Sequence, residues 1–437
     1  MRRYVLTSLH LLALLGLPSP SSAETIAFTG ARILPVAREP IASGVLVVRE
    51  GQIVAVGPAD STAVPPDARR VDVAGKTIIP GLVDTHSHVG GIGGADDSGP
   101  IQPDVRILDS INVRNPGFRR AVAGGLTTLN IMPGSGHLLG GRTIYVKLRG
   151  GTSIEDLYIR DVDGKPAGGV KMANGTNSRA APPFPGTRGK SAALMRAAFI
   201  KAQEYRDKIA RAAGDPEKMP PRDLGLETLV EILERKRVVH HHTHRHDDIL
   251  TVLRLAKEFN FRVVLHHVSD GWKVANEIAA AGAPCSVIVI DSPGGKLEAV
   301  DLDFKTSAVL EKAGVLTAIH TDDWITDSRL FLRSGALAVR AGMSRDGALK
   351  ALTISGAKML DLDARVGSLE PGKDADFVVL SGDPFSVYTQ VLETWVEGKK
   401  VFDRSDPKDH LYAVGGFGAG LEGEPDRGCC DREDDER

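Results

Sequence analysis

The sequence contains little cysteine, few aromatic residues and no excess of charge of either sign. It has 437 residues, of which 3 are Cys (Cys285, Cys429 and Cys430) and 5% are aromatic. Three cysteines cannot form the disulfide framework that stabilises small secreted domains, so a buried apolar core must hold the fold together. Because 54 Lys and Arg residues stand against 56 Asp and Glu residues, giving a formal net charge of −2, we expect no nucleic-acid partner.

The motifs of several enzyme classes are also missing. The chain has no Gly-x-Ser-x-Gly turn of a serine hydrolase, and its cysteines lie in an apolar run or near the C-terminus. The glycine-rich segment 134–141, GSGHLLGG, lacks the Lys-Ser/Thr ending of a phosphate-binding loop. Beyond the first 23 residues, no segment approaches the roughly 18 consecutive apolar residues of a membrane span. We therefore expect a mature protein without a nucleophilic Ser or Cys and without a membrane span.

The first 23 residues have the pattern of a signal peptide. Arg2 and Arg3 precede an apolar run from Val5 to Leu17, and the ending Ser21-Ser22-Ala23 offers the small residues of a cleavage site. An N-terminal membrane anchor is the alternative, but thirteen apolar residues are too few to span a bilayer. We predict a signal peptide over residues 1–23, a mature chain beginning at Glu24 and a periplasmic or secreted location, with the export route left open.

Short strand patterns occur near both ends of the mature chain. Residues 25–80 alternate apolar and polar positions with period two and break at Gly and Pro, which favours a small antiparallel sheet with one solvent-exposed face. Residues 365–404 repeat the pattern in GSLEPGKDADFVVLSGDP and VLETWVEGKKVF. We predict that residues 24–80 and 365–404 together form one small β-sandwich domain.

Between these ends, brief apolar runs alternate with amphipathic stretches of helical length. Residues 81–364 contain GGLTTLNIM, RVVLHHV and VLTAIHT beside DDILTVLRLAKEFN, GWKVANEIAAAG and SRDGALKALTISGAKMLDL. Repeated strand and helix units predict an α/β fold with a parallel sheet, most simply a (β/α)8 TIM barrel. Residues 179–236 interrupt the repeat and are predicted to be an insertion. The Gly-rich and then charged residues 415–437 are predicted to be a disordered tail.

Histidines stand at the ends of several predicted strands, where barrel enzymes gather their active-site residues. His86 and His88 close the apolar run TIIPGLVDTHSHV. Residues i and i+2 of an extended chain point the same way, so both imidazoles can bind one divalent metal ion. Further histidines follow in HHHTHRH at 240–246 and in RVVLHHV at 262–268.

Spacing puts additional candidate ligands on the same rim. The steps of 25 residues from His242 to His267 and of 55 residues from His267 to Asp322 suit one and two strand–helix units. Lys171 lies 85 residues after His86, which is enough for three units, so it can end the fourth strand. We therefore expect these five side chains to meet at one end of the barrel.

These residue types suit a hydrolytic metal site. Imidazoles and a carboxylate hold divalent ions such as Zn²⁺ and leave a position for water, whose pKa the ion lowers towards ~7. Asp322 can take the proton from that water and pass it to a leaving amine. Lys171 has the wrong charge as an ammonium ion. It becomes a ligand only if CO₂ carboxylates it, which creates an anion that can bridge two metal ions.

At these positions the chain resembles the amidohydrolase superfamily, in particular its imidazolonepropionase-like and prolidase-like members. The similarity runs from about Gly30 to Phe402 and includes PGLVDTHSHV, GGLTTL, HTHRHDD and RVGSLEPGKDADFVVL. The resemblance implies a set of metal ligands, in order along the barrel: His86 and His88 on the first strand, Lys171 as the carboxylated bridge on the fourth, His242 on the fifth, His267 on the sixth and Asp322 on the eighth. It also implies that Asp322 is the catalytic acid/base.

Adjacent residues leave the register of this set open by one position. His240 and His241 are alternatives on the fifth strand, His266 can replace its neighbour on the sixth, and Asp323 can replace Asp322. A shift of one residue turns a side chain to the opposite face of its strand. We choose the members named above by the pattern of the surrounding motifs.

Three residues near the predicted rim are candidates for substrate binding. His244 and Arg245 follow the fifth-strand ligand and can meet a substrate carboxylate or carbonyl, although capping and surface roles explain them equally well. His137 lies on the Gly-rich loop after the second strand and can reach the mouth of the barrel. Lys296 and Glu298 in GGKLE can form part of the rim near the seventh strand, or a structural ion pair.

Together these features predict an exported metal-dependent amidohydrolase that cleaves an amide or peptide C–N bond by metal-bound hydroxide. A dipeptide of the prolidase kind or a cyclic amide is the expected small-molecule substrate. We expect no membrane partner after signal cleavage and leave homo-oligomerisation open. Two alternatives are a deaminase with a single metal ion and no bridging lysine, and a non-catalytic protein that binds metal through its His-rich block.

Overall fold

The computed structural model describes residues 24–92, 96–289, 296–323 and 325–415. The predicted signal peptide, and all but Gly415 of the predicted tail, lie outside the described residues. Among the residues described, no helix combines the length and the hydrophobicity needed to cross a membrane.

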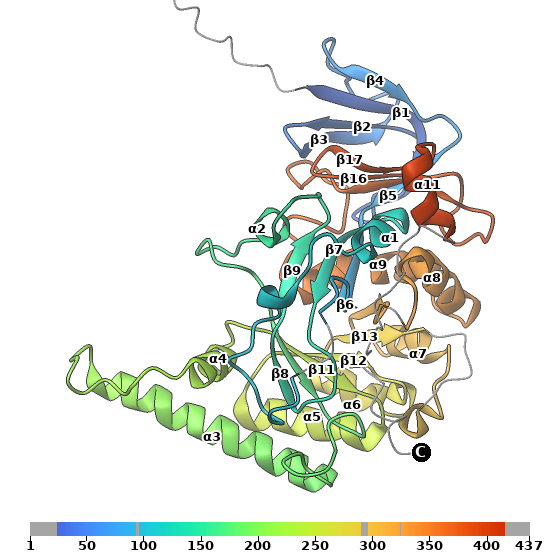
Figure 1. Ribbon diagram of the computed structural model, residues 1–437. Coiled ribbons are helices and arrows are strands. Elements are labelled where there is room, and N and C mark those ends of the chain that lie inside the picture. The colour runs from blue at the N-terminus through green and yellow to red at the C-terminus, as the bar shows by residue number, and fades with distance from the viewer. Residues whose placement is uncertain (1–23, 93–95, 290–295, 324, 416–437) are drawn as a thin grey trace, which may run out of the picture.

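One sheet joins segments from the two ends of the sequence, at the top of Figure 1. Its strands follow the order β17-β16-β15-β5-β1-β2-β3, and β4 pairs with β1. Their bounds are Thr25–Ile33 (β1), Ile41–Arg49 (β2), Gln52–Pro58 (β3), Arg69–Asp72 (β4), Thr77–Pro80 (β5), Phe377–Leu380 (β15), Val391–Val396 (β16) and Lys399–Asp403 (β17). The direct pairing of β5 with β15 brings the two strand-rich ends of the sequence together.

This sheet differs from the sequence-based expectation in two ways. β1 pairs in parallel with β4 and β5, because the connection 59–68 carries the chain back along the sheet after the β2–β3 hairpin. The expectation of a solvent-exposed face is wrong for β1 and β2. Phe28 and Leu46 lie in one apolar cluster, and Ala27 and Val47 lie in another. The same connection covers the second face, so both faces are buried there.

The larger part of the chain folds around strands that form a TIM-barrel-like α/β arrangement. β10 to β14 form a parallel run in sequence order, and β6 and β7 form a parallel pair. β14 ends beside β6, where the Asp322 amide donates a hydrogen bond of 3.0 Å to the His86 carbonyl. The strands are Leu82–Ser87 (β6), Leu126–Ile131 (β7), Leu139–Arg142 (β8), Ile144–Lys147 (β9), Val170–Ala173 (β10), Val239–Thr243 (β11), Val263–His267 (β12), Cys285–Ile288 (β13) and Thr317–His320 (β14).

The third place in the strand order breaks the expected parallel pattern. β9 pairs antiparallel with β7, and β8, which leads directly into β9, pairs antiparallel with β10. Only residues 132–138 connect β7 to β8, and no helix lies among them. A parallel neighbour needs a crossover connection of roughly a dozen or more residues. The short connection therefore returns the chain in the opposite direction.

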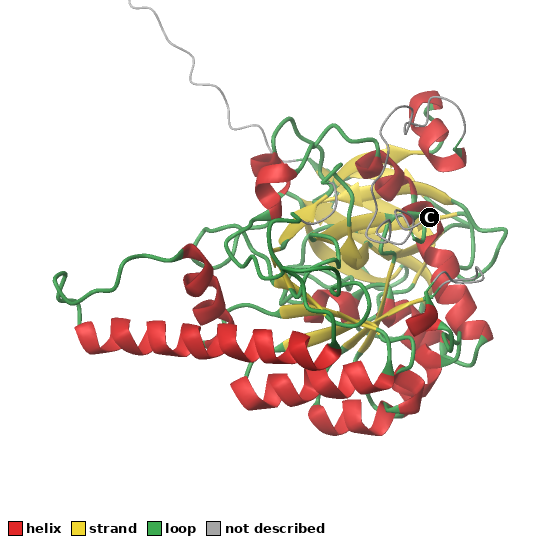
Figure 2. Ribbon diagram, turned by 60° about the horizontal axis from the view of Figure 1, so that its bottom comes forward, coloured by secondary structure: helices red, strands yellow, loops and turns green. Residues whose placement is uncertain are grey.

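Helices cover the outside of these strands (Figure 2). The stretch expected as one helix over residues 344–362 forms two, which separate at Thr353, where φ is −135° and ψ is −97°. The α-helices are Gly117–Ala123 (α1), Ile154–Leu157 (α2), Arg188–Ala212 (α3), Leu224–Leu233 (α4), His246–Phe259 (α5), Ala275–Ala281 (α6), Thr306–Lys312 (α7), Phe331–Arg340 (α8), Arg345–Ala351 (α9), Ile354–Met359 (α10) and Pro407–Val414 (α11). Short 3-10 helices are Ile107–Ser110, Gly271–Lys273, Leu297–Ala299 and Ser328–Leu330.

The predicted insertion at residues 179–236 contributes two helices, α3 and α4. α3 packs against both α4 and α5, and Figure 1 shows it along the lower edge of the molecule. Thr187 caps α3 by accepting a hydrogen bond from the Lys190 amide, and Asp223 caps α4 in the same way. Each helix therefore begins where the sequence provides a capping oxygen.

One face of the parallel strands carries polar side chains above an apolar floor. Strand register aligns Lys171 with His240 and His242 with His266. Val238, Val264 and Ala318, each two positions before one of the histidines His240, His266 and His320, form a small apolar cluster with Met359 of α10. The polar residues of this face therefore gather toward the carboxyl ends of the strands.

Lys147 of β9 gives a test of how the barrel strands are tied to the shared sheet. Its ammonium is fully buried, lies 3.0 Å from Asp376 and also pairs with Asp374. Removing one partner of a buried ion cluster leaves uncompensated charge, so Lys147→Met should lower the free energy of unfolding by about 3 kcal/mol in urea denaturation. As the control, Arg222→Ala breaks an exposed pair with Glu227 and should leave the urea midpoint unchanged. Equal losses in the two variants would contradict the argument.

Candidate metal centre

The six predicted ligands come from strands that end on one side of the fold. All are buried except His88, whose side chain is 10% exposed. They are His86 on β6 and His88 just after it, Lys171 on β10, His242 on β11, His267 on β12 and Asp322 just after β14. Because the carboxyl ends of parallel strands meet at one end of a barrel, side chains far apart in the sequence can reach one another.

Asp322 joins the two histidines of the β6 segment. Its Oδ1 atom lies 2.9 Å from Nε2 of His88 and 3.3 Å from Nε2 of His86. The ligand atoms of these three residues lie within 4.8 Å of one another. Lys171 extends the group, because its Nζ donates a hydrogen bond of 2.9 Å to Nε2 of His86. The residues expected on the first, fourth and eighth strands are therefore in direct contact.

His242 and His267 form a second group together with His244. The ring centroids of His242 and His267 are 4.3 Å apart, and His244 lies 4.6 Å from the first ring and 4.8 Å from the second. Their ligand atoms also lie within 4.8 Å of one another. His267 connects the two groups, since its Nδ1 lies 3.9 Å from Oδ2 of Asp322. The arrangement can hold one ion or two neighbouring ions.

Backbone conformation decides which histidine at the end of β12 joins the ligands. Strand register aligns His266 with His242, so alternation alone would turn His267 to the other face. His267 instead has a left-handed φ of 69°, and Val268 follows with 45°. This turn brings the His267 ring beside His242. Asp322 also has a left-handed φ, of 51°, and such conformations are uncommon outside glycine and concentrate at functional sites.

Burial keeps the ligand imidazoles neutral. It lowers the pKa of His86, His242 and His267 well below the usual value, and the nearby Lys171 ammonium lowers each of them further. The Lys296 ammonium acts on His242 in the same sense, consistent with the predicted position of Lys296 at the rim. A neutral imidazole keeps the lone pair that a metal ion requires.

The hydrogen bonds of these side chains fit a bound cation. Nδ1 of His88 donates to the Met132 carbonyl at 2.8 Å, which leaves the lone pair on Nε2. Neither ring nitrogen of His242, nor Nε2 of His267, has a hydrogen-bond partner among the described residues. Buried polar atoms almost always have partners, so a bound metal ion would supply the partner that these nitrogens lack among the described residues. Four imidazoles and a carboxylate are donors that Zn²⁺ accepts.

The three candidates for substrate binding lie in different surroundings. His244 belongs to the second ligand group. The Arg245 guanidinium pairs with Asp247, and none of its described contacts is to a ligand. His137 is buried with its ring centroid 5.1 Å from that of Phe184, again without a described contact to a ligand. The structure therefore brings His244 to the cluster, while Arg245 and His137 stay predictions.

Sequence reasoning missed a histidine on β14. His320 forms a group with His86 and His267 in which the ligand atoms lie within 4.8 Å of one another. Its Nε2 lies 3.1 Å from Nδ1 of His267. His320 stands two residues before Asp322, so the rule that aligned His86 with His88 also offered a signal here.

A further pair of histidines lies beneath the ligands. Nδ1 of His240 and Nε2 of His266 are 3.0 Å apart, and Nε2 of His240 lies 3.0 Å from the Tyr145 hydroxyl. Among the described residues, neither histidine belongs to a group of candidate ligands. This favours His242 and His267 over the alternatives that the sequence left open.

Asp84 holds the ends of β6 and β14 together. Its carboxylate accepts hydrogen bonds from the amides of His86 at 3.1 Å and Thr321 at 3.2 Å, and from the Thr321 hydroxyl. Burial raises the pKa of Asp84 to about 7. Because it bonds to both strands next to their ligands, Asp84 positions His86 and Asp322 relative to each other.

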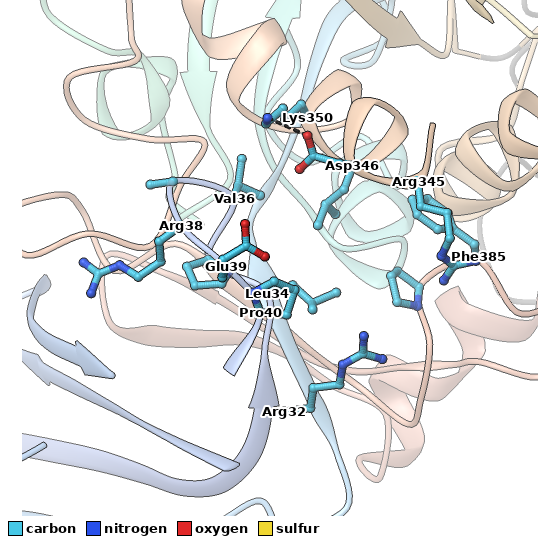
Figure 3. A pocket seen from close by; sticks show the side chains of 14 residues that line it. Arg32, Leu34, Val36, Arg38, Glu39, Pro40, Arg345, Asp346, Lys350 and Phe385 are labelled. Atoms are coloured by element: carbon cyan, nitrogen blue, oxygen red, sulfur yellow. Dashed lines mark hydrogen bonds and ion pairs between the residues drawn. The ribbon is translucent and has the colours of Figure 1, made fainter. Parts of the chain in front are cut away.

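A separate hollow of about 490 Å³ lies where the β1–β2 connection meets α9 (Figure 3). Charged side chains line it, and Lys350 pairs with Asp346 at 2.6 Å. Arg345 on its wall pairs with Asp383. None of the predicted site residues lines this hollow, which therefore lies apart from the metal centre.

Comparison with known proteins identifies the family. The profile of the Amidohydrolase family matches residues 222–402. The crystal structure of an amidohydrolase from Thermotoga maritima MSB8 is 35% identical, covers 87% of this chain and 100% of that chain, and gives a TM-score of 0.82. The chain belongs to the amidohydrolase family. This confirms the resemblance seen in the sequence, and the amidohydrolase is a hydrolase that acts on carbon–nitrogen bonds.

Other proteins that are similar to this chain, at lower sequence identity, are named after different activities. An imidazolonepropionase from Symbiobacterium thermophilum is 26% identical over 374 residues, which is 78% of this chain and 84% of the relative. A prolidase complexed with n-methylphosphonate-l-proline shares the fold at 17% identity, with a TM-score of 0.56 over 87% of this chain and 100% of that chain. Amidohydrolase tasK from Hapsidospora irregularis is 26% identical over 373 residues, 78% of this chain, but the chain spans only 38% of that protein. These names do not agree on one substrate.

The register on β11 can be tested with two neighbouring histidines. His242 lies in the second ligand group, whereas His241 is aligned with Met172 and Leu265 on the opposite face. We expect His242→Gln to weaken binding of Zn²⁺ about tenfold or more, measured by competition with a chelator. His241→Gln should bind Zn²⁺ as the unmodified protein does. The opposite result would shift the register by one residue.

Proposed function

We propose that this amidohydrolase is exported and cleaves the C–N bond of a dipeptide or a cyclic amide, using one or two Zn²⁺ ions. The contact of Asp322 with both His86 and His88 carries the proposal, because it unites a proton acceptor with metal-binding imidazoles in one buried site. The proposal includes the finer architecture, in which residues 81–364 form a closed (β/α)8-type barrel and residues 24–80 and 365–404 a β-sandwich.

The residues divide between two ion positions. His86, His88 and Asp322 would hold one ion, and His242 and His267 would hold the other. A bound divalent ion lowers the pKa of water towards neutrality and polarises a carbonyl group. The mixed nitrogen and oxygen donors are those that Zn²⁺ prefers in catalytic sites.

Asp322 is the residue proposed to move the proton. As a carboxylate it can accept a proton from the attacking water and then deliver it to the leaving amine nitrogen. Its amide donates to the His86 carbonyl at 3.0 Å, which fixes the segment beyond β14 against β6. A catalytic group held in position avoids the cost of being ordered during the reaction.

Lys171 suits the metal centre only in a modified form. An ammonium ion among the ligands repels a divalent cation. Addition of the neutral amine to CO₂, with release of one proton, would instead give an anionic carbamate with two oxygen donors. We infer that Lys171 carries this carbamate and bridges two ions. Support comes from its burial among the ligands, with 1% of the residue exposed.

The polar end of the substrate is proposed to meet His244. Its ring stacks on His267 with an interplanar angle of 14°, and its Nδ1 is 2.7 Å from the Ser269 hydroxyl. An imidazole beside the metal ligands can donate a hydrogen bond to the carboxylate of a dipeptide or the carbonyl of a cyclic amide. Arg245 and His137 are proposed to act farther out, at the mouth.

A deaminase with a single ion is the second candidate. The hydrogen bond from Lys171 to His86 favours it, since an unmodified lysine makes this contact and would leave the second ion without a bridge. Release of ammonia and one bound ion per chain would select this function. Membership in a family of hydrolases overturns the third possibility, a non-catalytic metal-binding protein.

The proposed chemistry predicts unequal effects of substitution at Asp322 and Asp323. Asp322→Asn should keep the fold and at least one ion while turnover falls about 10²- to 10⁴-fold, because proton transfer is lost. The Asp323 carboxylate accepts a hydrogen bond from Ser328 instead, so Asp323→Asn should stay active. Steady-state kinetics on a panel of dipeptides and cyclic amides provides the measurement. Full activity in both variants would refute the mechanism, and a reversed order would move the assignment by one residue.

The carbamate proposal predicts a change in metal stoichiometry. Lys171→Ala should lower the metal content from about two ions to one or none, because the anionic bridge of a two-metal site is lost. Added short carboxylic acids should restore part of the activity by replacing the carbamate. Unchanged stoichiometry and rate would make Lys171 an ordinary buried lysine.

Export predicts a defined N-terminus. Protein recovered from the periplasm or medium should begin near Glu24, because a signal peptidase cleaves after the small residues Ser21-Ser22-Ala23. N-terminal sequencing checks this. Exported protein that still begins at Met1 would disprove the cleaved signal.

A further inference from the structure

We propose that His320 is a positioning residue that sets the tautomer of His267, so that His267 presents Nε2 to the metal ion. The inference rests on the proposed function, because it takes His267 to be a ligand. His320 lies on β14 and has no other role in the proposed reaction.

A chain of hydrogen bonds runs from His267 into the barrel interior. Nδ1 of His267 lies 3.1 Å from Nε2 of His320, and Nδ1 of His320 lies 2.9 Å from the Ser286 hydroxyl. The Ser286 hydroxyl is in turn 2.6 Å from the Thr85 hydroxyl. All four residues are 1% exposed or less. Both ring nitrogens of His320 are engaged within this chain, which favours a role in supporting the ligand His267.

The chain can have only two polarities. The His320 ring is fully buried and is hydrogen-bonded only to a neutral imidazole and a hydroxyl in this chain, so we take it as a neutral ring with a single N–H. A neutral ring that is bonded at both nitrogens donates through one and accepts through the other. In the first polarity, His267 donates to His320, which donates to Ser286, which donates to Thr85. In the second, each of these donors becomes an acceptor.

The two polarities differ at Nε2 of His267. The first leaves a lone pair on this atom, and the second leaves an N–H. This nitrogen has no hydrogen-bond partner among the described residues, and His267 connects the two ligand groups, since its Nδ1 lies 3.9 Å from Asp322. A buried N–H there would lack an acceptor and would repel a cation. The first polarity is therefore favoured in the metal-free protein as well, and metal binding reinforces it.

His88 shows the same arrangement with a partner that can only accept. Its Nδ1 donates to the Met132 carbonyl at 2.8 Å, and its Nε2 faces Asp322 at 2.9 Å. Metal-binding histidines generally donate their other N–H to such a partner, which fixes both the tautomer and the ring orientation. The imidazole of His320 accepts the hydrogen bond from His267 of β12, as the Met132 carbonyl accepts the one from His88.

Two substitutions of His320 separate hydrogen bonding from bulk. His320→Phe keeps an aromatic ring but removes the acceptor, whereas His320→Gln keeps an amide oxygen that can accept from Nδ1 of His267. We expect the Kd for the more weakly held Zn²⁺ to rise about 10- to 100-fold in the Phe variant. The Gln variant should recover most of the affinity, and the visible spectrum of the Co²⁺-loaded protein should change and recover in parallel. Ile319→Val, in the outer apolar core of the same strand, is the control and should alter neither.

The tautomer can also be measured without metal. In metal-free protein labelled with ¹⁵N-histidine, His267 should be protonated at Nδ1, with its signals identified by their loss in His267→Gln. Protonation at Nε2, or unchanged Zn²⁺ affinity in both His320 variants, would overturn the inference. Loss of a whole metal equivalent from both variants would make His320 a ligand and would also overturn it. A wild-type protein that binds no divalent ion would instead refute the proposed function, and the tautomer measurement would still decide the polarity.

Discussion

Neutral imidazoles buried at the carboxyl ends of β6, β11 and β12 impose the constraint on which the rest of the site depends. Removal from water makes their protonation costly, and a buried lone pair without a partner is costly as well. A partner satisfies one nitrogen of His88 and one of His267, namely the Met132 carbonyl and the His320 ring. The inward nitrogens, such as those of His242, have no such partner among the described residues. A divalent cation held beside Asp322 would take a lone pair from such a ring and would balance the carboxylate at the same time.

The backbone meets this constraint at the points where the strands end. A strand can direct only every second side chain to one face, yet an imidazole directly after His266 is required. The left-handed conformation at His267 meets this requirement by turning one more side chain inward, and Asp322, two residues after His320, is left-handed as well. Such conformations cost on the order of 1–3 kcal/mol each. The hydrogen bonds of Asp84 to both β6 and the segment after β14 hold this strained end of the site in place.

The sequence could locate the rim because the strand–helix units from β11 to β14 have similar lengths, so regular spacing led to these strand ends. It could not decide between His266 and His267 by periodicity, since the choice depends on one φ angle. His320 was missed because a single histidine in an apolar strand gives no signal except its spacing from Asp322. The antiparallel β8 and β9 were missed because apolar runs were weighed without the short connection 132–138, which excludes a helical crossover.

Charge balance links the state of Lys171 to the number of ions that the site can hold. With an ammonium on Lys171, the charges of Lys171 and Asp322 cancel and the imidazoles add none. Two divalent ions would then leave a large positive charge in a buried site, where uncompensated charge is costly. A carbamate on Lys171 replaces a positive charge with a negative one, so the second ion and the carbamate stabilise each other. An unmodified Lys171 suits a single ion. We therefore propose that the choice between a binuclear amide hydrolase and a mononuclear deaminase depends, in this chain, on the chemistry of one buried amine.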